Sequence, residues 1–527
     1  MQAPNCVYVI HALLFIGVGY ICDVGTYIIR RSCLEKIKSR KFIFRIYMKM
    51  NGGGGGVQYE EEEGEVVEPV SPTGQYFNSS VLSVTVIGVL ESEIPVVIDD
   101  SITLKLIYDV FLPINPRFSS IMIEDENGVK QWKKVQVKPN NHIHIPIFPE
   151  GKSIEFYDEC FNDYLTKIAM EKLPQNQPLW EIHIITYPTK NSAGNLVFKL
   201  HHALGDGFSL MGALLSCLQR ADDPSLPITF PAFRNEPVGK STVGVCRKVP
   251  SILSGIGNTM ADFAWGVMKS TFLEDDKSPI RSGDEGVEFR PITITTMEFS
   301  IDQIKRIKAN LEVSINDVIC GVIFMGTRMY MEATNPEKMN ANSTALVLLN
   351  TRNIAGYKSV MEMVEPNPES KWGNQFGFLH VSVPTLSKNQ SSNPLNFIYK
   401  AKEIIQRKRN SAAVFFTGKL LETLRKHRGP EGTAAYVHNT LKNSSMTISN
   451  VFGPVDKLAL ANHPAKGMYF MVVGVPQSLT ITMVSYMRKL RIAVGTEKGF
   501  MDPQKYNSCI QEAFDIMMSK ASTASVS

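Results

Sequence analysis

The stretch "KLHHALGDGFSLMG", residues 199–212, places two adjacent histidines between an apolar run and an aspartate bracketed by glycines. The segment before the turn, "NLVFKLHH" (195–202), has the apolar pattern of a strand. The segment after it carries one helical apolar stripe, formed by Leu210, Leu214, Cys217 and Leu218. We therefore expect the histidines to lie where a strand ends and a helix begins.

Several kinds of reactive site are excluded by the spacing around this turn. Successive strand residues face opposite sides of a sheet, so His201 and His202 are poorly placed to bind one metal ion, and no HExxH helix is present. The nucleophile-elbow pattern GxSxG fails because "GFSLMG" has one residue too many after Ser209. A phosphate loop ending in "GKST" would need a glycine where Arg234 stands. We predict no metal site, no serine nucleophile and no nucleotide cradle.

A single histidine is sufficient for another kind of chemistry. Neutral imidazole, with an ordinary pKa of about 6.5, takes a proton from a hydroxyl and returns it to a leaving group, as acyl transfer requires. His202 lies nearer the loop and is the predicted base, whereas His201 is expected to turn into the sheet as a supporting residue. Asp206 is predicted to hold the turn through hydrogen bonds or an arginine pair. Gly205 and Gly207 are expected to allow left-handed backbone there.

The composition of the whole chain indicates what kind of protein this is. A length of 527 residues favours two domains, and 44% hydrophobic with 20% charged residues is typical of a folded protein. A formal net charge of +4 gives little field for nucleic acid, so no such partner is predicted. The eight cysteines include no CxxC pair, which indicates free thiols in a reducing compartment.

Residues 1–68 are interpreted as a hydrophobic leader followed by a low-complexity linker. The segment "CVYVIHALLFIGVGYICDVGTYIIRR" is apolar for most of the roughly 20 residues of a bilayer span, although His11 and Asp23 interrupt it. The basic run that follows would keep the next domain on the cytosolic side of a membrane. Alternatively, the working protein starts at Met48 or Met50 and lacks the leader.

The remaining chain predicts an α/β organisation with an N-terminal domain (69–235), an interdomain connection (236–290) and a C-terminal domain (291–527). The first half is expected to contain a strand, a helix and a hairpin at 80–90, 101–114 and 178–202. The connection holds an amphipathic helix, 251–273, that either touches a membrane or packs on its own protein. The second half is expected to contain a strand (291–299), a helix capped by Ser300, a long apolar helix (314–331), strands at 344–352 and 376–383, a meander of strands over 466–495 and a last helix near 503–519.

The motif "HHALGDG" (201–207) matches HHxxxDG, the signature of a superfamily of CoA-dependent acyltransferases. Five companion segments occur along the chain: "PLWE" (178–181), "FLEDDKSPI" (272–280), "SINDV" (314–318), "NTRN" (350–353) and "SNVFGP" (449–454). With these companions, residues of about 68 to 520 resemble the plant-type wax ester synthase/diacylglycerol acyltransferase family.

The resemblance implies two chloramphenicol-acetyltransferase-like domains, with mixed sheets flanked by helices and a tunnel between them. It implies that His202 is the catalytic base. It also makes Asn316 and Asp317 candidate contributions from the second domain, although Ser314 and Asp317 also match a helix cap and its partner, which is the favoured interpretation of Asp317. Trp180 and Trp372 are expected in the core. "SNVFGP" supplies two candidate donors to a developing oxyanion, Ser449 and Asn450.

The function implied by this resemblance is acyl transfer from acyl-CoA to a fatty alcohol or a diacylglycerol, without a covalent acyl-enzyme and without a cofactor. Both substrates partition into bilayers, so membrane association is expected, at the cytosolic face of the endoplasmic reticulum or, alternatively, at the plasma membrane. The rival functions are transfer to a small or phenolic acceptor and non-catalytic binding of lipid or acyl-CoA. Families with phenolic acceptors usually carry DFGWG where this chain has "SNVFGP". The acceptor, the acyl chain length and the oligomeric state are left open by the sequence.

Overall fold

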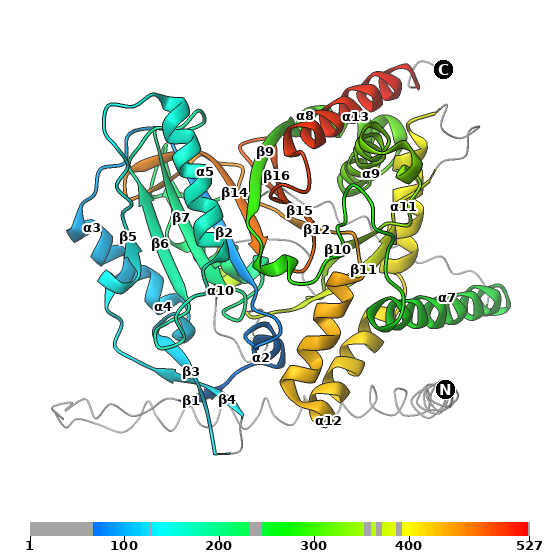
Figure 1. Ribbon diagram of the computed structural model, residues 1–527, viewed down its shortest axis with the longest axis horizontal. Coiled ribbons are helices and arrows are strands. Elements are labelled where there is room, and N and C mark those ends of the chain that lie inside the picture. Colours follow the sequence, from blue (N-terminus) through cyan, green and yellow to red (C-terminus); the bar gives the residue numbers. More distant parts are fainter. Residues whose placement is uncertain are drawn as a thin grey trace. The chain divides into compact units, whose positions relative to one another are not determined.

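The computed structural model divides the chain into two compact units, Met1–Gly64 and Glu65–Ser527. The structure describes parts of the second unit only, and these are shown in colour in Figure 1. They are residues 67–126, 129–230, 245–352, 360–364, 372–385 and 393–524. The predicted leader, residues 231–235 at the end of the predicted N-terminal domain and residues 236–244 of the expected connection lie outside these ranges.

A seven-stranded mixed sheet carries the double histidine. Its strand order is β5-β6-β7-β2-β14-β13-β8. The strands are Ile143–His144 (β5), Trp180–Ile185 (β6), Gly194–His201 (β7), Thr85–Ser92 (β2), His463–Val473 (β14), Leu458–Leu460 (β13) and Gln219–Arg220 (β8). β6 and β7 pair antiparallel, with Trp180 opposite Leu200, so the predicted hairpin is confirmed.

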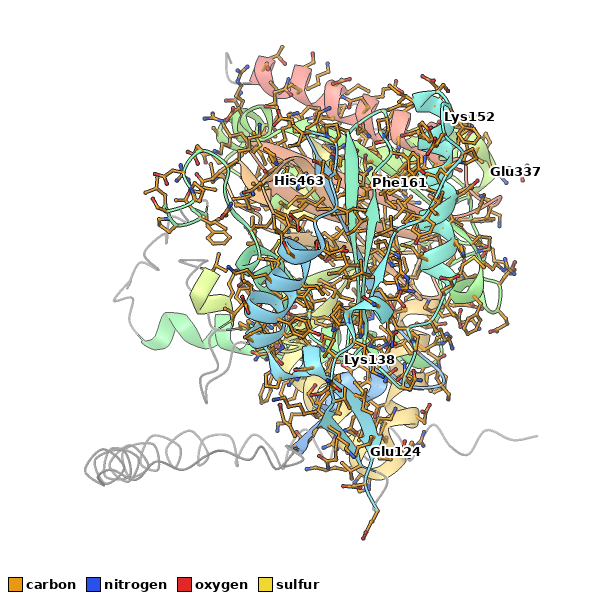
Figure 2. The ribbon with its side chains drawn as sticks, turned by 90° about the vertical axis from the view of Figure 1, so that its left-hand side faces the viewer. Glu124, Lys138, Lys152, Phe161, Glu337 and His463 are labelled. Carbon is orange, nitrogen blue, oxygen red and sulfur yellow. The ribbon has the colours of Figure 1, made fainter. Side chains whose placement is uncertain are left out.

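The two faces of this sheet are covered by different helices. On one face lies α5 (Ile154–Met170), whose buried side chains include Phe161, marked in Figure 2, and Leu165; these pack with Val197 of β7. On the other face Trp180 packs with apolar side chains of η1 (Leu106–Phe111) and α6 (Gly207–Ser216). Both faces of this sheet are therefore buried, and the double histidine lies at the end of β7, where the chain turns into α6.

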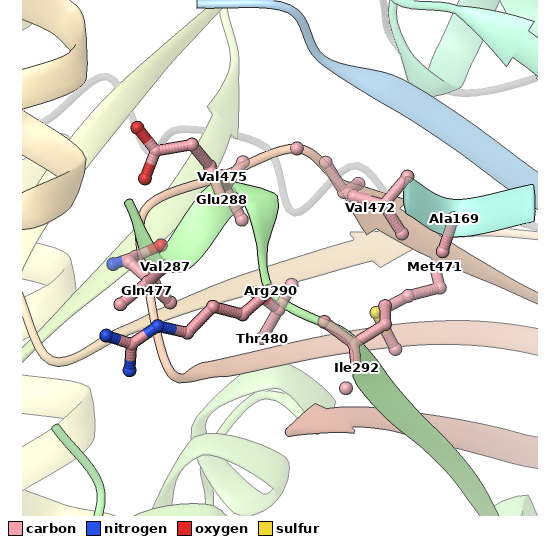
Figure 3. A pocket seen from close by; sticks show the side chains of 13 residues that line it. Ala169, Val287, Glu288, Arg290, Ile292, Met471, Val472, Val475, Gln477 and Thr480 are labelled. Atoms are coloured by element: carbon pink, nitrogen blue, oxygen red, sulfur yellow. The ribbon is translucent and has the colours of Figure 1, made fainter. Parts of the chain in front are cut away.

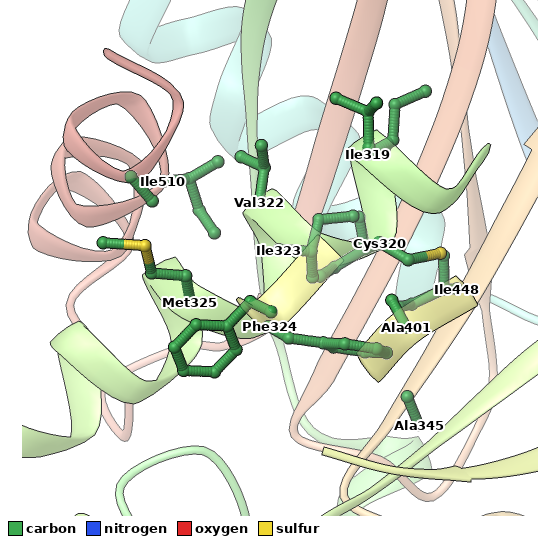
Figure 4. Close-up of a cluster of buried hydrophobic side chains, with 14 of the residues drawn as sticks. Ile319, Cys320, Val322, Ile323, Phe324, Met325, Ala345, Ala401, Ile448 and Ile510 are labelled. Carbon is green, nitrogen blue, oxygen red and sulfur yellow. The ribbon is translucent and has the colours of Figure 1, made fainter. Parts of the chain in front are cut away.

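A second, six-stranded mixed sheet has the order β11-β10-β12-β15-β16-β9. Its strands are Phe376–Ser382 (β11), Thr344–Asn350 (β10), Met446–Val451 (β12), Leu479–Tyr486 (β15), Lys489–Glu497 (β16) and Ile292–Ser300 (β9). The long apolar helix predicted at 314–331 is α9 (Ile315–Thr334), and its buried side chains form the centre of the core in Figure 4. A Cβ at Gly321 would lie 2.6 Å from Ile398, so this glycine lets α9 pack closely on α11 (Asn396–Arg409).

Further elements complete the described unit. A small sheet of β1 (Val67–Pro69), β4 (Lys130–Lys134) and β3 (Ser120–Glu124) lies outside the two large sheets. The remaining helices are α2 (Pro72–Phe77), α3 (Asp100–Lys105), α4 (Leu112–Ile114), η2 (Pro116–Ser119), η3 (Pro139–Asn141), α7 (Val245–Thr271), η4 (Val287–Phe289), α8 (Ile301–Leu311), η5 (Pro336–Lys338), α10 (Val360–Val364), α12 (Ala413–Lys442) and α13 (Pro503–Ala524). The predicted helix over 101–114 is therefore continued through a π-helical segment, η1.

The predicted meander over 466–495 is wrong in one respect. β15 and β16 pair antiparallel as expected, but β14 pairs with β2 of the other sheet, with Met471 opposite Ile87. Almost every residue of β14 from Gly467 to Val473 is buried, which suits a central strand covered on both faces. Residues 458–473 of the predicted C-terminal domain thus complete the sheet that carries the histidines.

Over the described ranges, no one helix has the length and apolarity to span a bilayer. Helices α8 and α9, which meet at a bend of 100°, satisfy that length and composition criterion only as a pair.

Candidate active site

The turn between β7 and α6 carries the motif. β7 ends at His201, and Asp206 caps α6 by accepting a hydrogen bond from the backbone N–H of Ser209 at 3.2 Å. Neither Gly205 nor Gly207 has a positive φ, so the expected left-handed backbone is wrong. Close approach explains these glycines instead: a Cβ at Gly205 would lie 2.8 Å from the Cβ of Ser209, and one at Gly207 would lie 3.1 Å from Val451.

His201 is fully occupied by structural hydrogen bonds. Its Nδ1 accepts from the backbone N–H of Ala203 at 3.1 Å, so the proton resides on Nε2, which lies 3.3 Å from the hydroxyl of Ser83. Burial lowers the pKa of His201 to about 3. The imidazole is therefore neutral at physiological pH, and its only lone pair is used by the turn.

His202 has the opposite tautomer, and Asn374 determines it. The amide Nδ2 of Asn374 donates to the carbonyl of His202 at 2.8 Å, so its Oδ1 faces Nδ1 of His202, also at 2.8 Å. Nδ1 must carry the proton to donate to that oxygen, which leaves Nε2 with a free lone pair. Among the described residues Nε2 has no hydrogen-bond partner.

The surroundings of His202 keep the ring neutral. Its ring centroid lies 4.8 Å from that of Phe77 and 5.6 Å from that of Phe376, and only 5% of the residue is exposed. Burial lowers the pKa of His202, and the opposing effects of Asp206 and Asn374 are smaller. A neutral imidazole with a free Nε2 is what a general base requires near pH 7.

Asp206 is held by Arg352, which follows β10 of the second sheet. Its two carboxylate oxygens lie 2.6 Å and 2.9 Å from the two terminal guanidinium nitrogens, and both side chains are buried. The backbone N–H of Gln375 donates to the same carboxylate at 2.9 Å. The sequence predicts that hydrogen bonds or an arginine pair hold Asp206, and both are present. These contacts join the histidine turn to two segments of the second half of the chain.

Two further contacts complete this connection. The indole Nε1–H of Trp372 donates to the carbonyl of Leu204 at 2.9 Å, and the backbone N–H of Gly373 donates to the hydroxyl of Ser209 at 3.0 Å. Gly373 has φ +107°, which favours glycine. Trp372 is buried, as expected from the sequence. Each of residues 372–375 thus donates a hydrogen bond to the turn between β7 and α6.

The candidate residues from the second domain fall into two groups. Asp317 forms the capping box with Ser314 that the sequence analysis weighed against a catalytic role, at 2.8 Å and 3.1 Å. Asn316 lies at the same helix start, and its Oδ1 is 3.5 Å from Nδ2 of Asn450 on β12. Ser449 is buried on the same strand. Val451, whose side chain would lie 3.1 Å from a Cβ at Gly207, places the end of β12 beside the turn. A catalytic contribution of these residues stays a prediction.

Sequence reasoning missed Asn374 and did not identify Arg352 as the partner of Asp206. Arg352 belongs to the quoted segment "NTRN", which was a signal that it mattered. Asn374 lies 172 residues beyond His202, and nothing in its local sequence indicates that it meets the histidine.

Two adjoining hollows lie at the seam between the two large sheets. The first, shown in Figure 3, is lined by α5, η4 and strands β9, β14, β15 and β16, with Glu288 and Arg290 among its polar side chains. The second shares Glu288 with the first and extends to Ser83, the partner of His201. The second hollow therefore reaches the hydrogen-bond partner of His201, and neither hollow is lined by His201 or His202 themselves. Over the described residues, no cluster of three or more His, Cys, Asp or Glu could hold a metal ion.

Comparison with known proteins places these features in a family. Residues 128–319 match the model of the wax ester synthase/diacylglycerol acyltransferase catalytic domain, and residues 372–518 match that of the WS/DGAT C-terminal domain. Wax ester synthase/diacylglycerol acyltransferase 11 of Arabidopsis thaliana is 27% identical over 472 residues, which cover 86% of this chain and 95% of the relative. Wax ester synthase/diacylglycerol acyltransferase 4 of the same plant is 27% identical over 457 residues, with 82% and 86% covered.

A solved structure shares the fold. The wax ester synthase/diacylglycerol acyltransferase from Marinobacter aquaeolei VT8 superposes with a TM-score of 0.53 at 15% identity, covering 86% of this chain and 100% of that one. The two-domain architecture of mixed sheets and helices expected from the sequence is confirmed.

This fold, with the HHxxxDG turn at its centre, defines an acyltransferase of the superfamily named above. The chain belongs to the wax ester synthase/diacylglycerol acyltransferase family, and the resemblance seen in the sequence is confirmed.

Proposed function

We propose that the chain transfers a long-chain acyl group from acyl-CoA to the hydroxyl of a fatty alcohol, a diacylglycerol or both. The observation that carries the mechanism is the tautomer of His202: Asn374 binds the Nδ1–H, so Nε2 is free to accept a proton. The family names of the relatives support the two acceptors.

The reaction follows from one moving proton. Nε2 of His202 takes the hydroxyl proton as the acceptor oxygen attacks the thioester carbonyl carbon. When the intermediate collapses, the new C–O ester bond remains and the C–S bond breaks. The proton on Nε2 passes to the sulfur, so free CoA leaves and the imidazole is neutral again. No covalent acyl-enzyme and no cofactor is needed, because both substrates occupy the site together.

Other residues of the site support this step. Asp206 and Arg352 fix the position of the turn, and Asn374 fixes the ring. Ser449 and Asn450 are the candidate donors to the negative oxygen of the intermediate, because β12 ends beside Gly207. For the acyl-CoA we propose the hollow lined by Ser83 and Glu288 as the start of one route of entry, because Ser83 is the hydrogen-bond partner of His201.

We also propose that the enzyme works at a membrane, at the cytosolic face of the endoplasmic reticulum, with the plasma membrane as the alternative. Long-chain acyl-CoA, fatty alcohols and diacylglycerol all partition into bilayers. The basic run after the leader segment, which begins at Arg30, favours a cytosolic position for the catalytic unit.

The test is an acceptor matrix. Labelled palmitoyl-CoA is incubated with the full chain and hexadecanol, a diacylglycerol, a short alcohol or a phenol, and the lipid products are separated. We expect wax ester, triacylglycerol or both. Ester formation only with the phenol or the short alcohol would contradict the acceptor class, and no product with any acceptor would favour non-catalytic binding. His202→Ala is the control for background reaction.

A further inference from the structure

Over residues 257–272, the outward side of α7 and its end carries exposed apolar side chains. Its exposed side chains form a stripe, with Trp265 40%, Met268 43% and Phe272 70% exposed. We call this set the α7 stripe: Ala261, Ala264, Trp265, Met268 and Phe272. These residues recur at helical spacing, so they share one side of the helix and its end.

The inward side of the same stretch holds its charged side chains, next to Phe263. Between residues 257 and 272 the only charged side chains are Asp262 and Lys269, and both are buried in ion pairs. Nζ of Lys269 lies 2.6 Å from Asp275, and Asp262 lies 2.8 Å from Nζ of Lys408. A surface helix in water has the opposite arrangement, with charges outward and apolar residues inward. The outward face of α7 therefore suits an apolar environment.

A series of contacts connects α7, through its residue Phe263, with the surroundings of His202. Phe263 of α7 contacts Phe416 of α12 with ring centroids 6.0 Å apart, and the neighbouring Phe415 is 58% exposed. Val414 lies against Gly377, where a Cβ would be 2.5 Å from its side chain. Gly377 follows Phe376, the aromatic ring beside His202. Figure 1 shows α7 beside the start of α12.

The segment around the start of α12 is strongly basic. Residues 396–428 contain nine Lys and Arg against two Glu, although the whole chain has a net charge of only +4. The basic residues with exposed side chains are Lys400, Arg407, Arg409, Lys419, Lys426 and Arg428. An apolar face with a basic flank is the combination by which amphipathic helices bind anionic membranes.

We propose that the α7 stripe, together with Phe415, inserts into the surface layer of an anionic lipid membrane, with residues 396–428 against the headgroups. The consequence rests on the proposed function: a lipid acceptor would enter from the bilayer next to the wall of the His202 site. A second copy of the chain fits this face less well, because an isologous contact would bring two equally basic segments together.

Intrinsic fluorescence gives a direct test on the full chain. Of the four tryptophans, Trp132, Trp180 and Trp372 are at most 7% exposed, so Trp265 is the one tryptophan on the surface. The probe is a vesicle of phosphatidylcholine and phosphatidylserine whose acyl chains carry bromine, a contact quencher. We expect quenching in the wild type, and its loss in Trp265→Phe with vesicle binding retained.

A matched pair of variants tests the stripe itself. Met268→Glu combined with Phe272→Glu is expected to weaken partitioning into these vesicles at least about tenfold. The reason is that two apolar side chains that would be buried in the membrane are replaced by charged ones. Ile147→Glu, at a position that is 89% exposed in the loop after β5, is the control and is expected to bind normally. Higher salt is expected to weaken wild-type binding, because basic residues contribute.

Three results would overturn the proposal. The first is vesicle binding without quenching of Trp265, which would mean that the leader or another surface makes the contact; residues 1–66 contain no tryptophan. The second is a dimer without lipid that dissociates in the double Glu variant, which would make the stripe a subunit interface. The third is loss of esterification in that variant with detergent-dispersed substrates. Failure of the proposed function would instead give a quenched but inactive wild type.

Discussion

The first prediction concerns Asn374, because its side chain determines which nitrogen of His202 carries the proton and which one is free to react. Replacing it with alanine removes two hydrogen bonds, each of 2.8 Å, one to the ring and one to the backbone carbonyl of the same residue. Hydrogen bonds of this kind contribute about 0.5–1.5 kcal/mol each. If both act in the reacting geometry, the loss of about 1–3 kcal/mol lowers kcat by roughly 5- to 150-fold.

Asn374→Asp separates orientation from simple packing. A carboxylate beside Nδ1 stabilises the imidazolium, so the pKa of His202, which burial holds below its ordinary value in the wild type, is expected to rise. The acidic limb of the pH profile of kcat then moves to higher pH. Asn310→Ala, which removes one side-chain hydrogen bond to the carbonyl of Ala521, is the matched control. The reasoning is refuted if Asn374→Ala keeps kcat within twofold of the wild type and the Asn374→Asp profile does not move.

Further predictions concern stability. Asp206→Ala removes the carboxylate that neutralises the buried Arg352 guanidinium. We expect a loss of about 3–5 kcal/mol in the free energy of unfolding, measured by urea titration, with a lower soluble yield. A variant that is stable but inactive would contradict this structural role. Burial lowers the pKa of His201 to about 3 and that of His380 to about 4. Between the unfolded pKa of about 6.5 and these lowered folded values, only the unfolded chain is protonated at these sites. As the pH is lowered through this range, the free energy of unfolding therefore decreases by about 1.4 kcal/mol per pH unit for each histidine. In His380→Gln, the free energy of unfolding should decrease less steeply between pH 6 and 4, by about 1.4 kcal/mol less per pH unit. An unchanged pH dependence would show that this histidine titrates normally in the folded state.

Local sequence pattern predicted the reactive turn well. It predicted the hairpin of β6 and β7, the helix that follows it and the position of the histidines between strand and helix. All three depend on residues within about one element of the motif. The partners of the motif could not be predicted in the same way. Arg352 lies 146 residues beyond Asp206, and Asn374 lies 172 residues beyond His202, so only the folded topology brings them together.

Two further features, the sheet that β14 joins and the orientation of α7, could not be predicted for the same physical reason. The apolar run of β14 predicts a buried strand, but it contains no information about which sheet the strand joins. The periodicity of α7 predicts an amphipathic helix, yet it does not say which face points inward. That choice depends on the distant Lys408 and on Asp275 beyond the end of the helix, which neutralise the charges of the inward face.

The most direct test of the central claim is the structure of a complex with a non-reactive thioether analogue of palmitoyl-CoA and a fatty alcohol. The account predicts that the alcohol oxygen lies about 2.6–3.2 Å from Nε2 of His202 and that Nδ1 still faces Asn374. A hydroxyl bound away from this ring, with Phe77 and Phe376 closing Nε2 off from both ligands, would contradict it.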